Sequence, residues 1–221
     1  MDENLKKELP IIGFVLLPFI YLGYLWNSLP EKVPIHWNYK GEIDDWGTKY
    51  ALIGVLFLLP VFTYVLMLLI PKIDPKKRIE FMGGKYYQIK FVLVVFMSVL
   101  ALFIIQSSQS QTISSPSMVF ILLGLLFVAL GNYFKVIKQN YFLGIKTPWT
   151  LESEEVWKLT HILAGKLWII GGLLIVIFSL VLSENVNFYI FIAITAIISI
   201  VPIVYSYVKF KELKTVKKSE F

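Results

Sequence analysis

The longest uncharged stretch of the sequence reads FVLVVFMSVLALFIIQSSQSQTISSPSMVFILLGLLFVALGNYF and covers residues 91–134. It is about twice as long as the roughly 20 apolar residues that cross a bilayer once. Residues 106–117, in its middle, are almost entirely Gln, Ser, Thr and Pro, and their polar groups are costly to bury unpaired in hydrocarbon. The stretch therefore predicts two membrane-spanning helices, at about 91–105 and 118–134, joined by a loop in water.

Four further stretches without Asp, Glu, Lys or Arg have lengths near that of a single crossing. They are residues 9–30, 50–71, 167–183 and 185–208. The whole chain is 57% hydrophobic and 16% charged, whereas about a quarter of the residues in soluble domains are charged. This composition excludes a soluble globular protein. We predict an all-α integral membrane protein with six transmembrane helices, the fifth of which begins before its uncharged stretch, near His161.

Basic residues are distributed unequally between the segments that join these helices. If the N-terminus lies inside the cell, 18 of the 21 Lys and Arg residues are inside, and only Lys32, Lys40 and Lys49 are outside. Cytoplasmic segments of membrane proteins are enriched in these residues, so both termini are predicted to be cytoplasmic. We divide the chain into residues 1–72, a helix pair with the outer loop 30–49, and residues 73–221, a four-helix region with the inner loop 131–166.

The one long outer segment reads PEKVPIHWNYKGEIDDWGTK, residues 30–49, and is rich in aromatic and acidic side chains. Pro30 and Pro34 disfavour a helix, and Lys40-Gly41 is a turn signal between two short extended pieces. The tryptophans could belong to an interfacial aromatic belt or contact a ligand. Under the second interpretation, the ligand-binding candidates are His36, Trp37, Asn38, Asp44, Asp45 and Trp46.

The outer segment also contains groups that could bind a metal. His36, Asp44 and Asp45 offer imidazole and carboxylate, which are zinc ligands in many proteins. A single histidine with flexible spacing is a weak motif, and the chain has no cysteine to add thiolate ligands. We therefore expect neither a metal nor a cofactor.

The inner segment GNYFKVIKQNYFLGIKTPWTLESEEVWKLTHILAGKLW, residues 131–168, is dense in turn and capping signals. Its turn formers are Asn140, Gly144 and Pro148. Thr150 is predicted to be the N-cap of a helix that lies at the membrane interface. On that helix His161 shares a face with Glu154 and Lys158. We predict that this face is exposed to solvent, with general acid–base chemistry as the alternative.

Several functional classes lack their usual sequence signals. No predicted crossing has a charged residue near its midplane, where ion-coupled transporters and proton relays usually need one. The sequence contains no HExxH motif, no phosphate-binding glycine loop and no Ser-His-acid set. We therefore expect no enzymatic activity. Two alternatives stay open: a small-molecule or lipid transporter with a neutral cavity, and a membrane enzyme that uses His36 or His161.

The strings GNYF at 131–134, NYFLGIKTPWTL at 140–151 and EVW at 155–157, followed by Lys166, resemble the signature of the SdpI family. The residues that carry this resemblance are Gly131, Asn132, Asn140, Gly144, Lys146, Thr147, Pro148, Trp149, Thr150, Glu155, Trp157 and Lys166. Residues 29–49 are similar to a domain of unknown function that often precedes this region. One position departs from the family pattern, because Lys146 stands where arginine is common. Lysine keeps the charge and loses the bidentate fork.

The resemblance implies a multi-pass protein of the bacterial plasma membrane that confers immunity to a secreted antimicrobial peptide toxin. It also implies signalling, in which the toxin-engaged protein holds a cytoplasmic transcriptional repressor at the membrane. A housekeeping role in the cell envelope is the alternative within the family. The expected partners are the toxin, the repressor and the lipid bilayer, without direct contact to nucleic acid. The outer segments have three basic and five acidic residues, which favours a cationic toxin.

Overall fold

The computed structural model describes residues 3–38, 40–112 and 116–219, with side chains described for 6–38, 40–112 and 116–215. The elements are α1 (Glu3–Leu25), β1 (Lys32–Trp37), β2 (Ile43–Thr48), α2 (Ala51–Leu56), η1 (Phe57–Val61), α3 (Phe62–Ile73), η2 (Glu80–Met82), α4 (Gly84–Ser110), α5 (Ser117–Phe134), α6 (Pro148–Glu152), α7 (Glu154–Val181) and α8 (Glu184–Ser219). Within these residues, six helical segments are long and apolar enough to cross a membrane, with α2, η1 and α3 forming one of them. The predicted all-α membrane architecture is confirmed.

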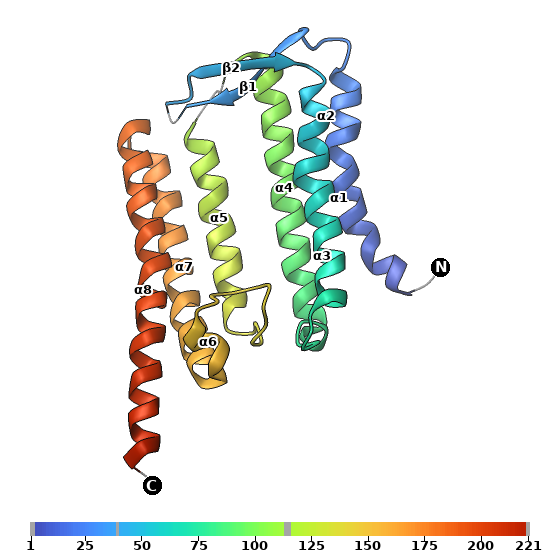
Figure 1. Ribbon diagram of the computed structural model, residues 1–221. Coiled ribbons are helices and arrows are strands. Elements are labelled where there is room, and N and C mark those ends of the chain that lie inside the picture. The colour runs from blue at the N-terminus through green and yellow to red at the C-terminus, as the bar shows by residue number, and fades with distance from the viewer. Residues whose placement is uncertain (1–2, 39, 113–115, 220–221) are drawn as a thin grey trace.

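The hairpin of β1 and β2 covers one end of the helices (Figure 1). The irregular segment after α5 and the short helix α6 lie at the opposite end, where α1 begins and α8 ends. We call the hairpin end outer and the opposite end inner, following the distribution of basic residues. The two extended pieces predicted around Lys40-Gly41 are confirmed as this hairpin.

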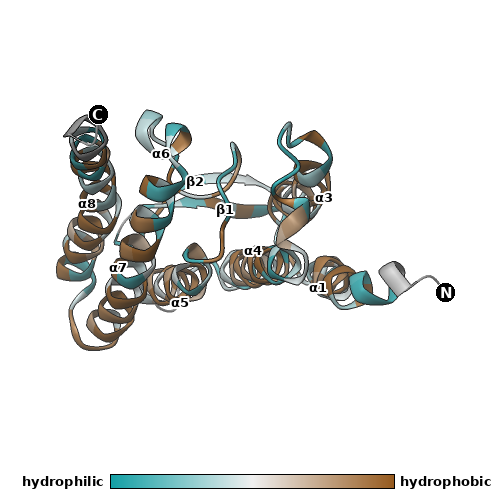
Figure 2. Ribbon diagram, turned by 90° about the horizontal axis from the view of Figure 1, so that it is seen from below, coloured by the Kyte–Doolittle hydropathy of each residue, from teal (hydrophilic) through white to brown (hydrophobic). Residues whose placement is uncertain are grey.

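The crossings form two groups, which Figure 1 shows side by side, and α4 and α5 are the neighbouring helices where the groups meet (Figure 2). One group contains α1, the α2–α3 segment and α4, and the other contains α5, α7 and α8. Large apolar side chains on the outside of the groups are exposed, including Ile20 (67%), Leu58 (65%) and Leu180 (70%). Apolar surface of this extent is typical of helices that face lipid.

Glycines hold α5 and α7 close together. A Cβ atom on Gly124 would lie 2.8 Å from the carbonyl oxygen of Gly172, and one on Gly131 would lie 2.9 Å from that of Gly165. Only glycine allows such backbone approach, which is a common way to pack helices in membranes. The α5–α7 pair is therefore a close-packed support for the inner segment that follows α5.

The outer end of α4 is helical where the sequence predicted a loop. α4 continues to Ser110, so the prediction that residues 106–110 form a loop is wrong. The hairpin and α1 supply partners for the polar side chains there, because Ser108 donates to the carbonyl of Pro34 (3.2 Å) and Gln106 accepts a hydrogen bond from Tyr21. Residues 113–115, also in the predicted loop, lie outside the described residues.

A buried ion pair joins the inner parts of α1 and α4. Lys90 Nζ lies 2.5 Å from Glu8 Oε1, and the Lys90 side chain is 6% exposed. The sequence places Lys90 just before the third predicted crossing, but α4 begins earlier and includes it. The pair lies near the inner end of both helices and leaves the prediction of uncharged midplanes intact.

Candidate functional site

The inner site is built around His161 of α7, which is buried. Its Nε2 accepts a hydrogen bond from the backbone N–H of Ile145 (3.0 Å), and its Nδ1 lies 2.8 Å from the carbonyl oxygen of Trp157. Nδ1 therefore has the proton, and the ring is neutral. The prediction of a solvent-exposed face at His161 is wrong, because the segment after α5 folds back over it. With both nitrogens bound to backbone, the acid–base alternative has no free proton-transfer atom there.

Gly144 makes this covering contact possible. Its φ angle is +97°, a conformation that side chains with a Cβ rarely adopt, and a Cβ there would lie 2.3 Å from His161 Nε2. The Trp157 and His161 rings stack with centroids 4.1 Å apart. The turn predicted at Gly144 therefore brings the backbone into close contact with the stacked rings of Trp157 and His161.

Side-chain amides and an indole fix the rest of the segment. Asn140 accepts from the N–H groups of Phe142 and Leu143, both at 2.7 Å, and donates to the carbonyl of Lys138. Gln139 donates to the carbonyl of Thr150 (2.7 Å), and Trp157 Nε1 donates to that of Ile137 (2.7 Å). These bonds satisfy backbone groups that would otherwise be unpaired in an irregular buried segment. The sequence analysis did not single out Gln139, and no motif marked it.

The predicted cap at Thr150 is displaced by three residues. Thr147 is the N-cap of α6, with Thr150 completing a reciprocal capping box, while Ser153 caps α7 by accepting from the N–H of Val156 (3.3 Å). The helix predicted after Thr150 begins at Glu154 and runs unbroken to Val181, so it is continuous with the fifth predicted crossing. α6 contacts α8 through Thr147 and Ser206, whose hydroxyls are 3.2 Å apart, and through the rings of Trp149 and Tyr207.

The other residues of the family-like signature have different positions. Gly131 lies in the close contact between α5 and α7. The exposed members are Asn132, Lys146, Pro148, Glu155 and Lys166. Lys146 Nζ donates to the carbonyl of Phe142 (3.0 Å), a bond that needs no bidentate fork. The buried signature residues therefore build the segment, and the exposed ones surround it.

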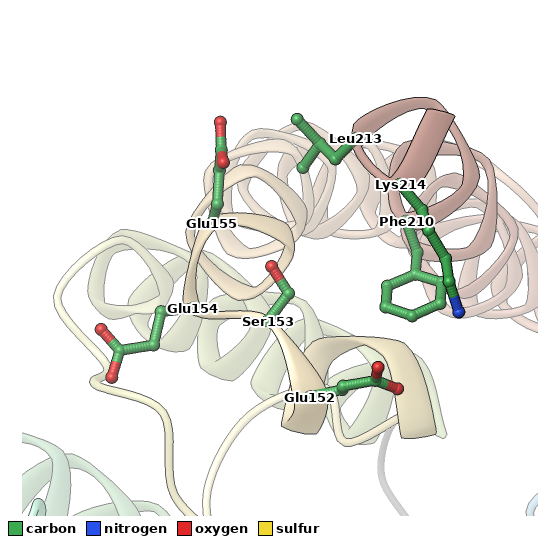
Figure 3. Close-up of a pocket in the computed structure, with 7 residues that line it drawn as sticks. All are labelled: Glu152, Ser153, Glu154, Glu155, Phe210, Leu213 and Lys214. Carbon is green, nitrogen blue, oxygen red and sulfur yellow. The ribbon is translucent and has the colours of Figure 1, made fainter. Parts of the chain in front are cut away.

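A groove of about 410 Å³ lies beside this segment, between the α6–α7 junction and the inner part of α8. Figure 3 shows Phe210 and Lys214 of α8 pointing toward α6 and Glu152. Glu154 points away from α8 in this view and pairs with Arg78. The groove combines carboxylates on one wall with an apolar and a basic side chain on the other.

At the outer end, the ligand-binding candidates of the hairpin differ in their hydrogen bonds and in their exposure. His36 Nδ1 lies 2.5 Å from Asp44 Oδ1, and Asn38 donates to Glu42 (2.8 Å) and accepts two backbone N–H groups in the turn. Asp45 accepts from the N–H of Trp46, whose side chain is exposed. Trp37 is half-buried, and its Nε1 is buried without a partner in the described part of the chain.

A pocket of about 410 Å³ lies under the hairpin. His36, Trp37, Asn38 and Gly41 form its roof, and its lower wall comprises Phe103, Ile104, Pro116, Val119, Phe120 and Phe188. Phe103 also lines a neighbouring groove of about 520 Å³ between α1, α4 and α5. Three of the predicted ligand-binding residues thus meet at one pocket, whereas Asp44, Asp45 and Trp46 are not among its lining residues.

Metal-ligating residues do not gather at either site. Among the described residues, no group of three or more His, Asp or Glu side chains could hold a metal ion. His36 and Asp44 bind each other, and Asp45 faces the N–H of Trp46.

Six apolar crossings, a pocket under an outer hairpin and a closely bonded inner segment define a multi-pass membrane protein. Residues 135–206 match the model of the SdpI/YfhL protein family, and residues 13–63 match a domain of unknown function (DUF1648). The chain is also 27% identical, over 184 residues, to "Immunity protein SdpI" of Bacillus subtilis (strain 168). The aligned residues make up 82% of this chain and 86% of the relative. No solved structure gives a significant match. The predicted resemblance and the location in a bacterial plasma membrane are confirmed.

Proposed function

We propose that this protein is a membrane immunity protein that protects the cell from a secreted antimicrobial peptide acting on the membrane. The observation that carries this proposal is the 27% identity to an immunity protein over 82% of the chain. An alignment of that extent includes parts of both helix groups. The bonded nitrogens of His161 support a role in binding or structure over one in catalysis.

The pocket under the hairpin is the best-supported place for the peptide. Its walls are aromatic and aliphatic, and the neighbouring groove between α1, α4 and α5 is similarly apolar, which suits an amphipathic ligand arriving through the outer leaflet. The unpartnered Nε1 of Trp37 can donate a hydrogen bond to a peptide carbonyl. The excess of acidic residues in the outer segments favours a cationic peptide.

The hairpin supplies a matched pair of tryptophans for testing this site. We would express wild type, Trp37→Ala and Trp46→Ala in a toxin-sensitive bacterium and compare survival at equal membrane abundance. Trp37→Ala should lose protection because it removes a pocket wall, while Trp46→Ala should keep most of it. Loss with Trp46→Ala alone would place recognition outside the pocket. A wild-type protein that protects against no peptide toxin of this class would end the immunity proposal.

We further propose that a cytoplasmic transcriptional repressor docks at the inner groove of Figure 3. Glu154 is paired with Arg78, so Glu152, Glu155 and Lys214 leave the groove with a net negative charge beside Phe210 and Leu213. Such a surface suits a partner with basic and apolar side chains. This differs from the net positive charge of the inner segments as a whole. The test follows a fluorescently tagged repressor encoded beside the gene, with toxin added. Glu152→Gln with Glu155→Gln should reduce its retention at the membrane, and Glu80→Gln, on the exposed inner surface, should not.

A further inference from the structure

A second inner cleft lies on the other side of Glu154 from the acidic groove, and its charged side chains are mostly basic. It has a volume of about 450 Å³ and lies between the α3–α4 connection, the end of α5 and the start of α7. The charged residues that line it are Arg78, Lys135, Lys138, Lys158 and Glu154. Glu154 pairs with Arg78, and the three lysines have no carboxylate partner among the described side chains. The cleft therefore holds three uncompensated positive charges.

These lysines lie at the level where lipid headgroups begin. Lys135 immediately follows α5, whose 18 residues are all uncharged, and Lys158 lies just over one turn into α7. An α-helix of that length spans roughly the hydrocarbon thickness of a bilayer. The cleft is therefore placed at the inner boundary of the membrane, where anionic headgroups are concentrated.

An apolar cavity adjoins the basic cleft on its membrane side. It has a volume of about 210 Å³ and is lined by side chains that include Leu93 of α4, Leu130 of α5 and Trp168 of α7. Ile137 lines both the cleft and the cavity, so the two are neighbours. The Nε1 of Trp168 is buried and has no hydrogen-bond partner among the described residues. An ester carbonyl of a lipid is an acceptor of the kind that this indole lacks.

We propose that the cleft and cavity together bind an anionic glycerophospholipid of the inner leaflet. The lysines contact its phosphate, and an acyl chain occupies the apolar cavity between the two helix groups. A free phosphate compound would use the cleft alone, whereas a lipid uses both halves of the site. The lipid would contact Ile137, which belongs to residues 135–147 that fold back over α7. The stability of these residues would then depend on the anionic lipid content of the inner leaflet.

The test measures lipid binding to the purified full-length protein in detergent, by native mass spectrometry. Phosphatidylglycerol and phosphatidylcholine with identical acyl chains are compared for wild type and three variants. The cleft variant is Lys135→Gln with Lys138→Gln and Lys158→Gln. The control variant is Lys72→Gln with Lys85→Gln and Lys211→Gln, which removes the same charge from exposed inner positions outside the cleft. Unfolding temperatures in phosphatidylcholine check that all four proteins are equally folded.

We expect wild type to prefer phosphatidylglycerol by at least about tenfold, and the cleft variant to lose most of that preference. The control variant should stay within about twofold of wild type, since diffuse surface charge is reduced equally in both. Leu130→Phe, which fills the cavity, should weaken lipid binding while leaving the lysines in place. Equal losses in the control variant, or equal binding of the two lipids by wild type, would overturn the proposal. Displacement of the lipid by inorganic phosphate or glycerol phosphate at similar concentrations would also overturn it, in favour of a soluble phosphate ligand.

Discussion

The contact between Gly172 of α7 and Gly124 of α5 allows a quantitative prediction. A Cβ on Gly172 would lie 2.5 Å from the carbonyl oxygen of Gly124 and 2.9 Å from both the backbone nitrogen and a methyl of Val128. Ordinary contacts start near 3.4 Å, so the two helices must separate by about 0.9 Å at this level. Overpacking of this kind costs about 1–3 kcal/mol, which exceeds the gain of up to about 1 kcal/mol from the better helix propensity of alanine.

Gly172→Ala should therefore lower the free energy of unfolding, measured in mixed micelles with increasing amounts of denaturing detergent. Gly13→Ala and Gly54→Ala are the controls, because both glycines are exposed on helices and a Cβ on either meets nothing within 4 Å. They should be neutral or slightly stabilising. If Gly172→Ala is as stable as these controls, the close approach of α5 and α7 is not what holds them together. Combining it with Gly124→Ala should cost less than the sum of the two, since both changes open one contact.

Three further predictions concern the inner segment and the topology. Gly144→Ala combines a strained φ with a clash against His161, so the inner segment should be cleaved faster by protease in inside-out vesicles, whereas Gly84→Ala, which meets no neighbour, should behave as wild type. Trp157→Phe keeps the ring stack and loses the hydrogen bond to Ile137, which should cost about 1–2 kcal/mol and speed amide exchange around residues 137–145; unchanged exchange would show that this bond does not hold the segment. Single cysteines at Asn38 and Asn185 should react with an impermeant thiol reagent in intact cells while those at Lys76 and Ser153 should not, and the reverse pattern would invert the orientation.

The sequence predicted the crossings well because their signal is the absence of charge, which is local and physically unambiguous. It placed the loop at 106–110 wrongly because a polar side chain can lie in a helix when another element supplies its partner. Ser108 has such a partner in Pro34, which is far away in the sequence. The hairpin was predicted correctly because its signal, like that of the crossings, is local: two extended pieces on either side of a turn are a short-range pattern.

The inner site was harder to predict than the fold. Its turn formers were recognised, but the burial of His161 depends on residues 135–147 folding back over α7, and helical periodicity alone cannot show that. The cap moved from Thr150 to Thr147 because both threonines satisfy the same sequence pattern, and only the backbone shows which one is extended. Gln139 has no motif at all, although its amide bonds two carbonyls of α6.

The distribution of bonded and free groups separates the scaffold of this protein from its recognition surfaces. The buried members of the inner signature use their hydrogen-bonding groups within the protein. Thr147 and Thr150 bond to each other, and Asn140 and His161 bond to backbone groups. Groups committed in this way can hold a shape, but they have nothing left for a ligand unless the segment opens. Side chains that line cavities without a hydrogen-bond or ion-pair partner are better placed to select a ligand. In the described part of the chain these include Trp37 at the outer pocket and the cleft lysines at the inner end. It follows that substitutions of the buried signature residues should act mainly through stability and abundance. Substitutions at the two cavities should instead change what the protein binds, at unchanged abundance.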